Sequence, residues 1–231
     1  MMKSGNSTEP TRVRQMFGDI ARRYDLANHT LSCGMDFYWR RCAASRTASW
    51  YPLKIVDLAT GTGDLALALQ KKLPHAEVTG VDFQSEMLEL AQRKGVRQTV
   101  LADAMKLPFP DGSFDCVTIA FGLRNMEDWR GALAEMSRVL RRNGHLLVLE
   151  FSLPTIPIVR ALYRFYLHRC LPVMGFFLTR KKSAYHYLGG SIEEFPSGRA
   201  MTELIEENGF GGAAFHPLTL GIATIYTAQR L

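Results

Sequence analysis

Apolar and polar residues follow two different periodic patterns through the middle of the chain. Short, mostly apolar runs are typical of strands buried in a sheet, and they occupy residues 54–59, 77–82, 97–102, 114–121 and 145–151. In the stretches between them apolar positions recur every three or four residues, which predicts helices at 64–72, 84–94 and 127–140. Strands and helices that take turns along a chain predict an α/β fold with a mainly parallel sheet.

The N-terminal part of the chain precedes this alternation. Residues 1–10 are polar and are expected to be a disordered tail. Residues 11–23 and 35–49 predict two helices joined by a polar loop. We expect one domain over 11–231, with these N-terminal helices at 11–49.

The C-terminal part departs from the alternation twice. Residues 154–190 contain six Lys or Arg, many large apolar side chains and no acidic residue, and we expect them to form an inserted helical cap over the carboxyl ends of the strands. Two apolar runs, 210–217 and 221–229, are separated by only three residues, which is the spacing of a β-hairpin. The sheet should therefore have seven strands and finish with an antiparallel element.

Composition limits the functions that the chain can have. Its 28 Lys and Arg outnumber 22 Asp and Glu, and the formal net charge of +6 is compatible with an anionic partner. The four cysteines form no Cys-x-x-Cys pair, so neither a metal site nor a disulfide framework is supported. The first ten residues lack a secretory pattern, and the longest apolar runs are far shorter than the roughly 20 residues that span a bilayer. We expect a cytoplasmic protein.

The stretch VDLATGTGDLA joins the first predicted strand to its helix, and such a turn binds a cofactor. Read as G-x-G-x-x-A with the acidic residue Asp82 about 20 residues later, it resembles a dinucleotide fingerprint. Asp57, however, lies four residues before Gly61. A carboxylate there repels a pyrophosphate but suits the amino group and sulfonium of S-adenosylmethionine, which we therefore predict as the cofactor.

Two further carboxylates extend this site along the sheet. Asp82 ends the second predicted strand and can accept hydrogen bonds from ribose hydroxyls, while Asp103 follows the third and can accept one from the adenine amine. Carboxyl ends of neighbouring parallel strands are where open α/β sheets bind ligands. The alternative is structural, since Asp57 and Asp103 could simply cap a turn and a loop.

Residues 54–151 resemble the class I S-adenosylmethionine-dependent methyltransferases. The resemblance implies a Rossmann-like fold and says almost nothing about the acceptor. The predicted cofactor-binding residues are Asp57, Thr60, Gly61, Thr62, Gly63, Asp82, Phe83, Met87, Asp103, Ala104 and Ala120.

Four other motifs resemble the quinone-biosynthesis C-methyltransferases, the demethylmenaquinone and polyprenyl-benzoquinol methylases. They are YDLANHTLS from Tyr24, FGLRN from Phe121, RVLRRNG from Arg138 and AYHYLGGSI from Ala184, and the likeness extends over 13–226. The chain departs from the family pattern in the positions Ala27, Asp36, Ala120, Arg141-Arg142-Asn143 and Tyr226. The resemblance implies C-methylation of a polyprenyl quinol, most directly demethylmenaquinol to menaquinol, with the methoxy-benzoquinol of ubiquinone synthesis, or both quinols, as alternatives.

Carbon methylation needs an electron-rich ring held in line with the methyl–sulfur bond. Arg124 and Asn125 follow the fourth strand and are the predicted binders of the forming phenolate. The proton would pass to water, His29, Tyr24 or Asp25. Each residue also has a structural alternative: packing of a helix for Tyr24, solvation for His29 and a surface or capping place for Arg124. The predicted substrate-binding residues are Tyr24, Asn28, Phe121, Arg124, Tyr185 and Tyr187.

The cap acquires a role if the substrate carries a prenyl tail. The basic residues of the cap would contact anionic lipid at the inner face of the cytoplasmic membrane. Its apolar residues would either form a channel for the prenyl tail or pack the helices together. These apolar residues are Phe165, Leu167, Leu171, Val173, Met174, Phe176 and Phe177. A homodimer is compatible with this arrangement. A nucleic-acid methyltransferase is disfavoured, since the chain has no added RNA-binding domain and no N/D-P-P-Y/F motif. A non-catalytic S-adenosylmethionine-binding subunit would not need Tyr24, Arg124 and Asn125.

Overall fold

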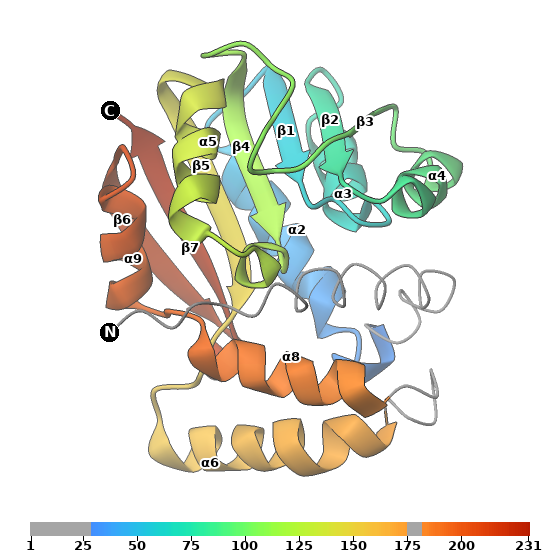
Figure 1. The fold of residues 1–231 in the computed structure, drawn as a ribbon, viewed down its shortest axis with the longest axis vertical. Coiled ribbons are helices and arrows are strands. Elements are labelled where there is room, and N and C mark those ends of the chain that lie inside the picture. Colours follow the sequence, from blue (N-terminus) through green and yellow to red (C-terminus); the bar gives the residue numbers. More distant parts are fainter. Residues whose placement is uncertain (1–28, 175–181) are drawn as a thin grey trace.

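The computed structural model describes residues 29–174 and 182–231, with the backbone alone for 182–186 (Figure 1). Its centre is a sheet made of β1 (Lys54–Leu58), β2 (Glu77–Asp82), β3 (Gln98–Leu101), β4 (Phe114–Ala120), β5 (Leu140–Phe151), β6 (Phe210–Leu218) and β7 (Ala223–Arg230). The strand order is β3-β2-β1-β4-β5-β7-β6. The first five strands are parallel, whereas β7 is antiparallel to β5 and β6. The predicted mainly parallel sheet with an antiparallel end is confirmed.

Helices cover both faces of the sheet. They are α2 (Met35–Ala48), α3 (Asp64–Lys72) and α4 (Ser85–Lys94) on one face, and α5 (Trp129–Val139) and α9 (Arg199–Glu206) on the other. Neighbouring residues of one strand pack on opposite faces, and both are buried: Ile55 packs with the first group of helices and Val56 with the second. Burial on two faces is why the strands are continuous apolar runs.

The order of the strands places a crevice beside β1. This strand pairs with β2 on one side and with β4 on the other, so the connections leave it in opposite directions. A crevice opens at the carboxyl ends of the strands where that reversal occurs, and ligands bind there in open α/β sheets.

Two elements differ from the expectation. β5 begins at Leu140, five residues earlier than predicted, and the register shifts between its pairs Phe114–Leu140 and Cys116–His145. The Asn143-Gly144 pair, with φ of 61° at Asn143, resembles a turn in the sequence but lies within a bulged strand. Helix α9 was not predicted.

The helical cap crosses the carboxyl ends of the parallel strands, where Figure 1 shows α6 (Pro157–Phe165) and α8 (Lys182–Glu194) side by side. A π-helical segment, Tyr166–Cys170, continues α6. The inner side of the cap packs against Leu31 in a small apolar cluster, to which the cap contributes Tyr163, Leu167, Leu171 and Ile192. The cap was expected at 154–190, and α8 continues to Glu194.

The expected tail at 1–10 and the helix at 11–23 lie outside the described residues. None of the helices within 29–174 and 182–231 has the length and apolar character needed to cross a membrane.

Candidate active site

The chain leaves β1 through a turn whose backbone requires glycine. Gly61 and Gly63 have φ of 56° and 84°, a region that side chains with a Cβ disfavour. A Cβ on Gly63 would lie 2.4 Å from the Val96 side chain and 3.1 Å from Cβ of Ala91. The turn therefore brings the start of α3 close to α4, and it points the amide of Gly61 at Asp82, to which it donates a hydrogen bond of 2.8 Å.

Two cavities meet above this turn, and they share Ala59, Gly61, Ala120 and Phe121 as walls. The smaller, of about 130 Å³, is bordered by predicted cofactor residues from the ends of β2 and β3, namely Asp82, Phe83, Met87, Asp103 and Ala104. The larger, of about 450 Å³, runs from Asp57, Thr60 and Thr62 to the inner side of the cap. Thus all the predicted cofactor residues except Gly63, which shapes the turn, line one cavity or the other.

Asp57 stabilises the glycine turn through hydrogen bonds. It is buried, and its two oxygens accept hydrogen bonds from the hydroxyls of Thr60 (2.7 Å) and Thr118 (2.8 Å). Burial raises the pKa of Asp57 to about 6, although these hydroxyls and Arg40 oppose the shift. The structural alternative for Asp57 is thus realised, and the residue also lines the larger cavity.

Asp82 links the turn to the smaller cavity. Its carboxylate accepts the Gly61 amide and, at 3.0 Å, the Gln84 amide, and burial raises its pKa. A carboxylate offers about four acceptor sites, so capacity remains for hydroxyl groups in the cavity. Asp103 also lines this cavity and accepts the Met105 amide at 2.9 Å, so it caps its loop as well.

The donors and acceptors of the two cavities fit S-adenosylmethionine. The smaller cavity combines apolar walls with two carboxylates on neighbouring strands, which suits an adenosine, and the larger offers a glycine turn and charged groups for an amino-acid end. The buried Oδ1 of Asn125, which borders the smaller cavity, has no hydrogen-bond partner in the described part of the chain. Such an orphaned acceptor fits a ligand that carries an N–H or O–H group.

Arg124 lies on the wall of the larger cavity, bound to a carboxylate that sequence reasoning missed. Its Nη1 donates to Glu150 Oε1 at 2.7 Å and to the Phe121 carbonyl at 2.5 Å, and its guanidinium carbon is 5.2 Å from the centre of the Phe151 ring. Glu150 is completely buried, which raises its pKa, while the adjacent Arg124 opposes the shift. The Nε–H of Arg124 is buried and has no partner within the described ranges.

Phe121 separates the two cavities in a strained conformation. Its φ of 58° is unusual for a residue other than glycine. Its carbonyl accepts from Arg124 and, at 3.3 Å, from the Asn125 side chain, and its amide donates to the Leu149 carbonyl at 2.8 Å. The LRN turn after β4, Leu123–Asn125, thus holds the wall in place.

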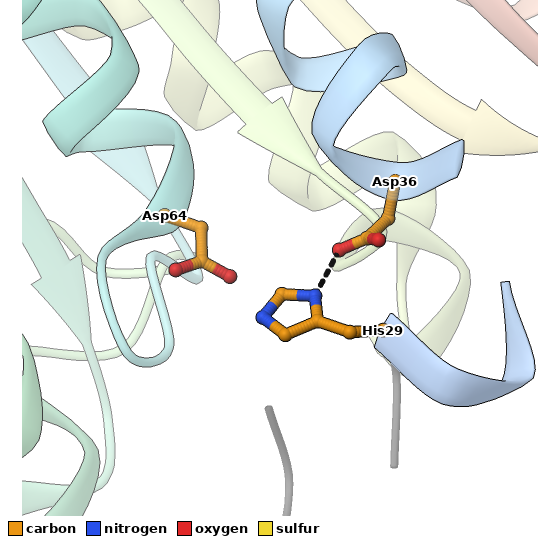
Figure 2. A group of neighbouring side chains, drawn as sticks. All are labelled: His29, Asp36 and Asp64. Atoms are coloured by element: carbon orange, nitrogen blue, oxygen red, sulfur yellow. Dashed lines mark hydrogen bonds and ion pairs between the residues drawn. The ribbon is translucent and has the colours of Figure 1, made fainter. Parts of the chain in front are cut away.

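His29 belongs to a charged cluster at the entrance of α2. Figure 2 shows its ring between the carboxylates of Asp36 and Asp64, with Nδ1 at 2.6 Å from Asp36 Oδ2. The three side chains could reach one ion, since their ligand atoms lie within 4.8 Å of one another. Each carboxylate is, however, paired with a cation, Asp36 with Arg40 at 2.5 Å and Asp64 with Lys94. This charge balance accounts for the cluster without an ion.

Of the remaining predicted residues, some lie outside the described part of the chain and others do not line the larger cavity. Tyr24 and Asn28 lie outside the described residues. So do Phe176 and Phe177, two of the candidates for a prenyl-tail channel, and the side chain of Tyr185. The described lining of the larger cavity includes neither His29 nor Tyr187, whereas Asp36, Leu188 and Ile192 belong to it.

The cap contributes two tyrosines that were not predicted. Tyr163 and Tyr166 line the larger cavity, and the Tyr166 hydroxyl donates to the Leu31 carbonyl at 2.6 Å. Burial raises the pKa of both, to about 12 for Tyr166, so both are neutral near pH 7. Tyr226, one of the departures from the family pattern, lies in the core and accepts the Gly198 amide at 3.0 Å.

Comparison with known proteins agrees with this geometry. A model of the ubiE/COQ5 methyltransferase family matches residues 3–230. The chain belongs to this family. A demethylmenaquinone methyltransferase from Thermus thermophilus is 46% identical over 93% of this chain and 100% of its own length. The ubiquinone/menaquinone biosynthesis C-methyltransferase UbiE of Citrifermentans bemidjiense is 42% identical over 97% of this chain and 98% of its own.

Solved structures show the same fold. A SAM-dependent methyltransferase from Thermotoga maritima, described as a possible histamine N-methyltransferase, superposes with a TM-score of 0.65 at 18% identity, covering 94% of this chain and all of that one. The predicted class I methyltransferase fold, the resemblance to the quinone methylases and the cofactor S-adenosylmethionine are confirmed.

Proposed function

We propose that this methyltransferase transfers a methyl group to a ring carbon of a polyprenyl quinol, converting demethylmenaquinol to menaquinol. One observation carries the proposal: a single cavity of about 450 Å³ reaches from the glycine turn to the apolar inner side of the cap. The sulfonium end of the cofactor and a hydrophobic acceptor would therefore share one space. The names of the relatives that are 46% and 42% identical support the acceptor class.

Arg124 is the proposed binder of the oxygen of the acceptor ring. Bound S-adenosylmethionine would supply an electrophilic methyl group, whose bond to sulfur breaks as its bond to the ring carbon forms. The ring carbon becomes more nucleophilic when a neighbouring ring hydroxyl loses its proton. The hydrogen displaced from that carbon returns to the phenolate oxygen as aromaticity is restored, so one proton leaves overall. The unpartnered Nε–H of Arg124 is a donor for the developing phenolate. Glu150 offsets the guanidinium charge and fixes its orientation, while the rings of Phe121 and Phe151 exclude water from the same wall.

The proton acceptor is proposed beside Asp36, which lines the same cavity. The ring Nδ1 of His29 lies 2.6 Å from Asp36 Oδ2, and Asp36 lines the cavity; histidine is the side chain most often used as a general base. Hydrogen bonds from Ser32 and the charge of Arg40 hold the pKa of Asp36 below its ordinary value despite its burial. A water between the quinol and His29 would complete the path, with Tyr24 as the alternative acceptor.

The outer side of the cap is proposed to rest on anionic lipid. Ile158, Leu162 and Phe165 project from one side of α6 and are 67%, 65% and 62% exposed. Exposed Arg169 follows them along the chain; basic residues near a membrane contribute about 1 kcal/mol each. Leu162 also lines the larger cavity, so the mouth of the cavity opens beside this apolar stripe.

Mass spectrometry of the products tests the acceptor. Purified protein and S-adenosylmethionine are incubated with detergent-solubilised demethylmenaquinol and, separately, with a methoxy-benzoquinol analogue. A gain of one methyl group on the naphthoquinol carbon supports the proposal, and labelling of both quinols extends it to dual specificity. If the protein binds S-adenosylmethionine but methylates neither quinol, the acceptor assignment is wrong.

A further inference from the structure

One cation in the larger cavity has been described above only through its effect on the carboxylates of Asp36 and Asp57. Arg40 lies on α2 and lines the larger cavity together with residues of the glycine turn, which are Asp57, Thr60, Gly61, Thr62 and Asp64. Only 12% of its side chain is exposed.

The Arg40 guanidinium is held in place before any ligand arrives. Its Nη1 donates to Asp36 at 2.5 Å, and its Nη2 is 3.8 Å from Asp64 Oδ2, which is too long for a hydrogen bond. The guanidinium carbon is 5.4 Å from the centre of the Phe121 ring, the wall between the two cavities. Of its five N–H donors, the contact with Asp36 is the only hydrogen bond made to the described residues, so a planar pair of donors is left for a ligand.

The cofactor brings a negative charge that a cation would balance at this place. The methionyl end of S-adenosylmethionine carries an ammonium group and a carboxylate. Carboxylates already surround the turn and suit the ammonium, but they repel a second carboxylate unless a cation lies between. Lys94 is bound to Asp64 and Thr62 and lies outside both described cavity linings. Arg124 is bound to Glu150 and the Phe121 carbonyl.

We propose that Arg40 binds the methionyl carboxylate of S-adenosylmethionine, so that helix α2 completes a cofactor site that the sheet leaves open. Arginine matches a carboxylate with two parallel N–H groups, and such charge-assisted pairs are among the stronger hydrogen bonds. The inference rests on the cofactor of the proposed function and not on its acceptor.

Isothermal titration without quinol tests this role, so failure of the acceptor assignment would not affect the result. The wild type and Arg40→Met are titrated with S-adenosylmethionine and with its decarboxylated form, which keeps the sulfonium and the amine. We expect Arg40→Met to weaken binding of S-adenosylmethionine by about tenfold or more, equivalent to roughly 1.4 kcal/mol. Its affinity for the decarboxylated form should change by less than about threefold, within the range of an ordinary surface substitution.

Two further variants keep the result interpretable. Arg40→Lys retains the charge but not the paired donors and should recover part of the selectivity for the carboxylate. Arg41→Met removes the exposed neighbouring arginine of α2 and should bind both ligands as the wild type does. Equal losses for the two ligands in Arg40→Met and Arg40→Lys, or no loss for either, would overturn the proposal.

Discussion

Replacing Glu150 with glutamine should leave the buried Arg124 guanidinium without its counter-charge. The carboxylate accepts three hydrogen bonds, from Arg124 Nη1 (2.7 Å), the Arg124 amide (3.3 Å) and the Phe151 amide (2.9 Å). Glutamine keeps one acceptor oxygen but places an N–H donor at the other position, where it faces another donor. Breaking one side of a buried ion pair costs about 3–5 kcal/mol. Because glutamine preserves the shape and part of the bonding, we expect the free energy of unfolding to fall by about 3 kcal/mol.

Urea unfolding followed by circular dichroism measures this loss. The double variant Arg124→Met/Glu150→Gln removes both charges and keeps an acceptor oxygen for a backbone amide, so it should be more stable than Glu150→Gln alone while losing quinol methylation. The reasoning is refuted if Glu150→Gln unfolds within about 0.5 kcal/mol of the wild type. It is also refuted if the double variant is the less stable of the two.

Three other predictions concern the turn, its glycines and the cap. Burial raises the pKa of Asp57 from 3.8 to about 6, so between these values the native state holds more protons than the unfolded state. The unfolding free energy should therefore fall by up to about 3 kcal/mol as pH rises from 4 to 7. The variant Asp57→Asn should lack this part of the pH dependence. Gly63→Ala should destabilise the fold by about 1–3 kcal/mol and weaken cofactor binding, whereas Gly61→Ala, with no atom within 4 Å of the added Cβ, should cost less in urea unfolding. Phe165→Ser should lower sedimentation with anionic vesicles roughly tenfold, with exposed Tyr51→Ser, before β1, as the unaffected control.

Each of these has a contrary outcome. A pH slope that persists unchanged in Asp57→Asn would mean that another group titrates in that window. Equal costs for the two glycine variants would show that φ, and not the approach of α3 to α4, governs the turn. If vesicle binding depends on Tyr51 as much as on Phe165, α6 is not the membrane-binding face.

Local patterns were sufficient for the sheet and for the cofactor turn. The strands of the parallel part are buried on both faces, so their apolar runs stand out, and Gly61 and Gly63 follow the first of them directly. β5 was shortened because Asn143-Gly144 has the composition of a turn, and nothing local distinguishes a turn from a bulge inside a strand.

The missed site residues have partners far away along the chain. Glu150 lies one residue before the end of β5 and belongs to the site because Arg124, 26 residues earlier in the chain, forms an ion pair with it. Arg40 lies on α2 and reaches the cavity only because α2 packs along α3. Tyr163 and Tyr166 line the cavity because the cap folds back over the sheet. Spacing in one sequence cannot report such contacts, since they are decided by tertiary packing.

The strained peptide at Phe121 changes how variants of Arg124 must be interpreted. A left-handed conformation at a phenylalanine costs on the order of 1–3 kcal/mol and persists only when its surroundings hold it. Here the Arg124 side chain is one of the groups that hold it, and the same peptide borders the space for cofactor and the space for acceptor. Loss of Arg124 would let that peptide relax, so the Michaelis constants of both substrates should shift together. A kinetic defect in such a variant would therefore reflect movement of the Phe121 peptide between the two cavities as much as loss of the guanidinium charge.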